Sequence, residues 1–120
     1  MKPTKLSLFF LALLTSPTLA QIYTMPAEGD LHPIVSKSPT IVSTLKQIYE
    51  KVNQYFGKSK IRLSLEEDPE IKGFEQVVVE ILVPPTMTDA MERQSKFDRE
   101  WWLQARQNET ADILVTVWPE

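Results

Sequence analysis

The stretch "FEQVVVEILV", residues 74–83, decides the fold class of this 120-residue chain. Its three consecutive valines, residues 77–79, are apolar on both faces of a β-strand, because successive side chains in a strand point to opposite sides. Such a run is typical of a central or doubly covered strand. The two prolines that follow end the strand, since proline cannot donate to a sheet ladder.

The preceding segment, "KIRLSLEEDPE" at residues 60–70, has a different pattern. Ile61, Leu63 and Leu65 alternate with polar residues, which indicates a strand with one buried face. The polar connection between the two strands is short, and a short connection favours antiparallel pairing. The chain therefore contains a predicted antiparallel strand pair.

An amphipathic helix is expected before this pair. Ser38 suits the N-cap and Pro39 the first helical position. Gly57 suits the left-handed residue that ends a helix. The apolar stripe consists of Ile41, Leu45, Ile48, Val52 and Tyr55.

A second helix is expected after the strand pair, from Thr86 or Thr88 to about residue 107, and "ILVTVW" at residues 113–118 reads as a third strand. The order helix, strand, strand, helix, strand predicts an α+β two-layer sandwich with both helices on one face of a small three-stranded sheet. A right-handed crossover would return the last strand beside the first, giving an all-antiparallel sheet. Residues 38–120 would form this single domain.

Two adjacent tryptophans occur in the second helix. Neighbouring helical side chains point about 100° apart, so Trp101 and Trp102 cannot both face the core. Trp101 fits the stripe that contains Phe97, which leaves Trp102 on the flank, one turn before Arg106. The predicted core comprises Ile41, Leu45, Ile48, Val52, Leu63, Val79, Phe97, Trp101 and Val115.

Trp102 therefore has two readings. In the first, it covers the edge of the sheet or the first helix, with Arg106 stacked over its ring in a cation–π contact. Alternatively, it is partly exposed and anchors a partner protein, because Trp and Arg are enriched at interface hot spots. The predicted partner-binding residues are Trp102, Arg99, Arg106 and Trp118.

The first twenty residues have the three parts of a secretory signal peptide. Lys2 and Lys5 precede an apolar run at residues 6–14, which is too short to span a bilayer. Cleavage is expected between Ala20 and Gln21, placing the mature protein in the periplasm or outside the cell. Residues 21–37 would then be an extended arm with a short edge strand at residues 34–35. The alternative is a cytoplasmic protein that starts at Met25.

The composition narrows the possible chemistry. Cleavage would remove two of 13 basic residues and no acidic ones, changing the formal charge from −3 to −5. Nucleic acids and anionic membranes both need a basic surface, so neither is an expected partner. His32 is the sole histidine and there is no cysteine. We expect no catalytic residue, no metal and no cofactor, although the acidic connection containing Glu66, Glu67, Asp68 and Glu70 leaves calcium as an alternative.

Residues 46–117, including "YFGKSKIRLSLEEDPE", resemble small uncharacterised bacterial α+β proteins whose helix carries Phe-Asp-x-x-Trp-Trp. Phe97, Asp98, Trp101 and Trp102 match this motif. The resemblance implies a fold but no activity, and such proteins look cytoplasmic, so the signal-like N-terminus is a departure.

The expected function is that of an exported, non-enzymatic protein-binding module. One alternative is an exported small-ligand or carbohydrate-binding protein with a tryptophan platform. A second is an immunity- or antitoxin-like cytoplasmic protein, if translation starts at Met25. A carboxylate-based hydrolase that uses Asp98 is the weakest reading, because so small a domain leaves little room for a cleft.

Overall fold

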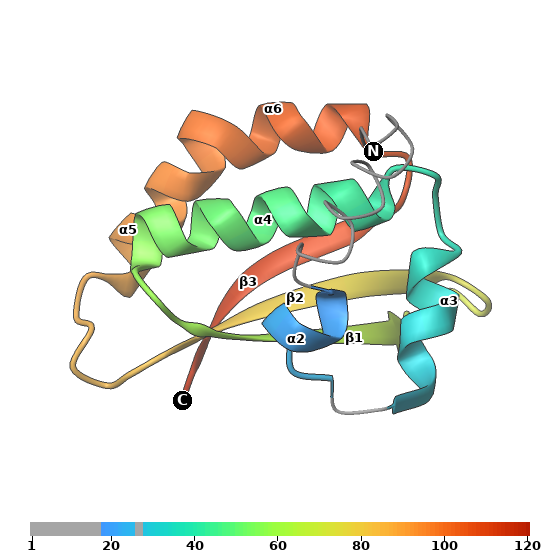
Figure 1. Cartoon of the computed structure of the whole chain (residues 1–120), viewed down its shortest axis with the longest axis horizontal. Coiled ribbons are helices and arrows are strands. Elements are labelled where there is room, and N and C mark those ends of the chain that lie inside the picture. The colour runs from blue at the N-terminus through green and yellow to red at the C-terminus, as the bar shows by residue number, and fades with distance from the viewer. Residues whose placement is uncertain (1–17, 26–27) are drawn as a thin grey trace, which may run out of the picture.

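The structure, a computed structural model, describes residues 18–25 and 28–120. A three-stranded sheet lies under one layer of helices, which confirms the predicted α+β two-layer sandwich (Figure 1). The strands are β1 (Lys60–Glu67), β2 (Glu75–Val83) and β3 (Ile113–Pro119). The main helices are α4 (Ile41–Phe56), α5 (Ala90–Phe97) and α6 (Leu103–Ala105). No helix in the described part of the chain is long and apolar enough to cross a bilayer.

The sheet has the order β1-β2-β3 and is mixed. β1 and β2 pair antiparallel as predicted, but β3 pairs parallel with β2. The prediction of an all-antiparallel sheet was therefore wrong about the neighbour of β3. The helical crossover returns the chain in the direction of β2, and β3 joins the side of β2 whose backbone groups are still unpaired. The valine run of residues 77–79 thus occupies the central strand.

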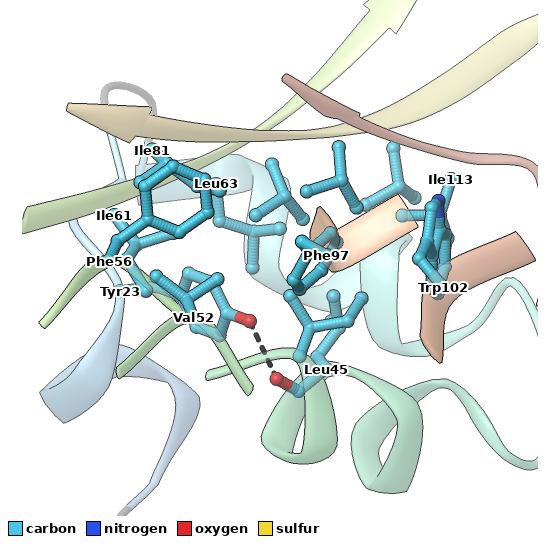
Figure 2. Packing of buried hydrophobic residues seen from close by; sticks show 14 of the residues in the cluster. Tyr23, Leu45, Val52, Phe56, Ile61, Leu63, Ile81, Phe97, Trp102 and Ile113 are labelled. Carbon is cyan, nitrogen blue, oxygen red and sulfur yellow. Dashed lines mark hydrogen bonds between the residues drawn. The ribbon is translucent and has the colours of Figure 1, made fainter. Parts of the chain in front are cut away.

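The core forms between the sheet and α4. Every predicted core residue except Trp101 is buried. Phe97 is fully buried at the centre of the core (Figure 2). Its ring centroid lies 6.0 Å from that of Tyr55 and 6.4 Å from that of Phe56. α4 ends at Gly57 with φ 76°, as predicted. An aromatic side chain at the layer boundary buries a large apolar area and so fixes the spacing of helices and sheet.

The helix after β2 contains a π-helical turn, Asp98–Trp102, between α5 and α6. Within it the Leu103 N–H donates to the Asp98 carbonyl, an i to i−5 bond. A π turn adds one residue to the helical repeat. The side chain that continues the face of Phe97 is therefore five residues on, at Trp102, instead of four residues on, at Trp101.

The prediction of an extended arm at residues 21–37 was wrong. This segment contains the end of α2 (Leu19–Ile22), a 3₁₀ turn (Glu28–Asp30) and α3 (Leu31–Val35), so the predicted edge strand at residues 34–35 is helical. The apolar side chains here belong to the core: Tyr23 is 3% exposed and Ile34 fully buried. Sequence periodicity could not reveal these elements because each is only about one turn long.

Tyr23 ties this segment to α4. Its hydroxyl donates to the Leu45 carbonyl at 2.6 Å (Figure 2). Burial, with a smaller contribution from Tyr49, raises the pKa of Tyr23 above its ordinary value, so the hydroxyl stays a donor. The next residue, Thr24, makes a parallel bridge to β1 at Arg62.

The outer edge of β1 is therefore occupied. The Thr24 N–H donates to the Ile61 carbonyl at 2.8 Å, and the Leu63 N–H donates to the Thr24 carbonyl at 2.8 Å. One step further, the Leu65 N–H donates to Asp30 Oδ2 at 3.3 Å. Edge strands protected in this way cannot pair with another strand.

A carboxylate joins the start of α4 to the turn before β3. Glu109 accepts hydrogen bonds from the hydroxyls of Ser38 (2.6 Å), Thr40 (2.9 Å) and Thr44 (2.6 Å), and from the Ala111 N–H (2.9 Å). Burial opposes ionisation, but these four donors outweigh it and lower the pKa of Glu109. The negative charge also lies at the positive end of the α4 dipole.

Glu109→Gln should lower the free energy of unfolding at neutral pH by about 1–3 kcal/mol, the usual loss for hydrogen bonds to a charged group. Because the folded-state pKa lies below the ordinary 4.5, this stabilisation is complete above that value and disappears as the pH falls through the folded-state pKa. Urea unfolding of both proteins between neutral and acidic pH measures the difference. Glu50→Gln, at an exposed site on α4, is the control. An equal effect of both substitutions would contradict this role.

Candidate functional site

The structure reverses the predicted roles of the two tryptophans. Trp102 is 4% exposed and lies beside Ile113 in the core, so its assignment as a partner-binding residue was wrong (Figure 2). Trp101 is half-buried and packs edge-on against Phe97 at a centroid distance of 5.5 Å. The Lys51 ammonium lies 5.9 Å from the Trp101 ring centroid, a cation–π contact on the flank where Trp102 was expected.

Of the other predicted partner-binding residues, Arg106 lines the same hollow as Trp102, whereas Arg99 and Trp118 do not. Arg99 is exposed, and its Nε donates to the Ser95 carbonyl at 3.3 Å. Arg106 is exposed beside a hollow of about 220 Å³ that Trp102 also lines. Trp118 lies five residues beyond Ile113 on β3, roughly 17 Å along the strand and on the opposite face of the sheet.

Trp118 instead belongs to the face of the sheet opposite the helices, here called the open face. It is 53% exposed and lies next to Leu82 of β2 in the strand register. Leu114, 44% exposed, lies next to Val78, which is buried at the centre of the same face. These four side chains form two apolar cross-strand pairs on the open face, Val78 with Leu114 and Leu82 with Trp118.

A polar row separates the two apolar pairs. Arg62 and Glu80 are opposite each other in the β1–β2 register, and Arg62 Nη2 lies 2.6 Å from Glu80 Oε2. On its other side Glu80 is the register partner of Thr116 in β3. On β3 the open face therefore presents Leu114 and Trp118 on either side of Thr116.

The outer edge of β3 is free in the part of the chain that the structure describes. The Val77 N–H donates to the Asp112 carbonyl, and the Glu120 N–H to the Val83 carbonyl. In a parallel ladder with these bonds, the N–H and C=O groups of the even-numbered residues of β3 point toward β2, and those of the odd-numbered residues point away from the sheet. The peptide groups of Ile113, Val115 and Val117 consequently face away from the sheet. Pro119, which has no N–H, ends the outward-facing row.

Helix α5 lies near this edge. Gln94 Nε2 donates to the outward carbonyl of Val115 at 3.4 Å, a long hydrogen bond. Met91 lies three residues before Gln94, on the same side of α5, and is 71% exposed. The free edge is thus flanked by apolar side chains from the open face and by Met91 from the helical layer.

The acidic side chains between β1 and β2 accept hydrogen bonds from backbone groups of their own turn. Asp68 accepts from the N–H groups of Glu70 and Ile71, and Glu67 from that of Gly73, so the acidic connection forms a capped turn. Burial raises the pKa of Asp98, an effect that Arg106 partly offsets. Within residues 18–25 and 28–120, no three His, Asp or Glu side chains converge as metal ligands.

Two hollows of about 600 and 580 Å³ flank α2. Their linings include Tyr23 and Tyr49 in the first and Val42 and Lys46 in the second, and neither lining contains a tryptophan. The volumes suit small ligands, which bind in pockets of roughly 300–1,000 Å³. The hollows do not support a tryptophan platform for carbohydrate.

Comparison with known proteins found no matching family model, no matching curated protein and no matching solved structure. The resemblance through Phe-Asp-x-x-Trp-Trp therefore stays a prediction. Leu114 is not among the residues predicted from the sequence to bind a partner. The signal was present in "ILVTVW", since Leu114 and Trp118 occupy the face that Thr116 marks as the polar one.

Trp102→Ala should lower the free energy of unfolding by about 3–5 kcal/mol, because it leaves a cavity in the core. Trp101→Ala should cost only about 1–2 kcal/mol, since its ring is half-exposed. Urea denaturation of the two variants, with equal m-values, measures both. The opposite ranking would show that the helix has no π turn in solution and that Trp101 faces the core.

Proposed function

We propose that this protein is a non-enzymatic binding module that pairs the free edge of β3 with an extended strand of another polypeptide. The observation that carries the proposal is the asymmetry of the sheet. Thr24 and Asp30 occupy the outer edge of β1, whereas the outward peptide groups of β3 have no backbone partner among the described residues. Strand addition uses such an edge for main-chain hydrogen bonds.

The side chains beside the edge support the same function. Main-chain hydrogen bonds alone do not discriminate between partners, so specificity comes from side chains next to the paired strands. Leu114 and Trp118 present an exposed apolar surface there, and tryptophan is enriched at interface hot spots. Trp118 thus retains the partner-binding role predicted for it, while Trp102 does not.

We also propose export, with a mature N-terminus at Gln21. The expected cleavage bond lies inside the short helix α2, so a signal peptidase must act before this segment folds. Cleavage there removes Leu19 from the core but keeps Tyr23 and the Thr24 bridge. A start at Met25 would remove both Tyr23 and the Thr24 bridge and so expose the edge of β1. We therefore favour Gln21 over Met25 as the mature N-terminus.

Mass spectrometry of the protein expressed from its native start in a bacterial host should find a periplasmic chain that begins at Gln21. Leu19→Ala should leave the melting temperature of that mature chain unchanged, because the residue has been removed. Tyr23→Ala should lower the free energy of unfolding by about 3–5 kcal/mol, through loss of a buried aromatic side chain. A cytosolic chain starting at Met1 and destabilised by Leu19→Ala would contradict export.

Leu114→Ser should weaken capture of the partner polypeptide from an extract of the source cells by tenfold or more, about 1.4 kcal/mol. Leu103→Ser is the matched control, because Leu103 is 49% exposed on α6, outside the open face. Hydrogen exchange localises the contact: the outward amides of Ile113, Val115 and Val117 should be protected only in the complex. The inward amides of Leu114, Thr116 and Trp118 should be slow in both states.

Equal capture by both variants, or a complex in which the outward amides still exchange rapidly, would refute strand addition at β3. Circular dichroism melts of the two variants should be similar, since both side chains are largely outside the core. A large melt difference would assign Leu114 a structural role instead.

A further inference from the structure

We infer that the strand that pairs with β3 is β3 of a second copy of this chain. The inference rests on the proposed function, because it uses the same free edge and names its occupant. Two copies would pair their β3 strands antiparallel about a two-fold axis and form one continuous six-stranded sheet. Both helical layers would lie on the same side of that sheet.

The number of free edges determines the stoichiometry. Each chain offers one free edge in its described part, at β3, because Thr24 and Asp30 occupy the outer edge of β1. An interface that uses the same edge in both copies is isologous and closes after two. A sheet with two free edges would continue to grow into a filament, but this one cannot.

The side chains on the open face fix the register. If the two-fold axis passes between the two copies of Thr116, then Leu114 of each chain lies opposite Trp118 of the other. Both are non-hydrogen-bonded positions, where facing side chains approach most closely. This register pairs the two most exposed apolar side chains of β3 with each other, and such cross-strand aromatic–aliphatic pairs stabilise sheets.

The backbone groups suit the same register. Val115 of one chain lies opposite Val117 of the other, so the outward N–H and C=O groups of both residues find partners. The Ile113 N–H lies opposite the carbonyl of Pro119, whose missing N–H falls at the end of the paired segment. Gln94 must release the Val115 carbonyl, but its 3.4 Å hydrogen bond is long and therefore weak.

Acidic side chains meet at both ends of the paired segment. The register brings Asp112 of one chain opposite Glu120 of the other. Asp112 accepts from Gln76 at 3.4 Å, and the Glu120 carboxylate lies 4.0 Å from the Lys60 ammonium. Residual repulsion between these acidic groups predicts tighter association as the ionic strength increases. Met91, highly exposed on the side of α5 that flanks this edge, adds apolar surface in the helical layer.

The test places like charges on the two-fold axis. Thr116→Lys should leave the fold intact, because a lysine there can pair with Glu80, its neighbour in β2. In the dimer it faces the same lysine of the other copy, so the dissociation constant of the dimer should increase by at least about tenfold. Thr116→Glu should do the same through two facing carboxylates. A mixture of the two variants should restore the dimer by pairing Lys with Glu.

Sedimentation equilibrium of the full chain should show twice the monomer mass for the unsubstituted protein and monomers for each variant alone. Glu66→Gln also raises the formal charge by one, but at an exposed site on β1, away from β3, and it should remain dimeric. An unsubstituted protein that stays monomeric up to its solubility limit would overturn the inference. So would a Thr116→Lys protein that remains dimeric, or a mixture that fails to associate.

These outcomes separate the two proposals. If the unsubstituted protein is monomeric while Leu114→Ser still abolishes capture of another polypeptide with protected outward amides, self-pairing is wrong and strand addition stands. If neither association nor capture depends on β3, both proposals are wrong.

Discussion

The fold depends on placing two large aromatic side chains, Phe97 and Trp102, against one face of the sheet although they are five residues apart. An α-helix would turn them away from each other, and the π-helical turn realigns them. With both rings buried, α5 and α6 cover β2 and β3 as a single layer. Trp101 lies outside that layer, where its ring contacts Phe97 on one side and the Lys51 ammonium of α4 on the other.

The segment before α4 covers the outer edge of β1. Tyr23 is anchored through its hydroxyl to the Leu45 carbonyl, and this anchor holds Thr24 against β1. One side of the sheet is thus closed by a residue of the same chain. On the other side, β3 carries exposed apolar side chains next to outward peptide groups that have no backbone partner among the described residues. The two edges of the sheet therefore present different surfaces.

The long, periodic elements could be predicted from sequence, and the short or irregular ones could not. The apolar stripe of α4 and the alternation in β1 could be recognised because each element has one buried face, and the spacing of its apolar residues follows that face. The neighbour of β3 depends on what occupies β1, namely Thr24, a contact between distant residues that no local pattern contains. The core role of Trp102 depends on one extra residue in a helical turn. For the proposed binding surface, the sequence analysis named Trp118 but not Leu114.

The parallel pairing of β2 with β3 joins strands that are far apart in the sequence. The β1–β2 hairpin and α4 are contiguous in sequence and can assemble early, but β3 follows β2 only after the whole helical crossover. Until β3 docks, the most apolar strand of the protein has a bare edge, and such an edge is prone to aggregation. The hydrogen bonds that Glu109 accepts from Ser38 and Thr44 hold the end of that crossover against the start of α4 and so place the chain for its entry into β3.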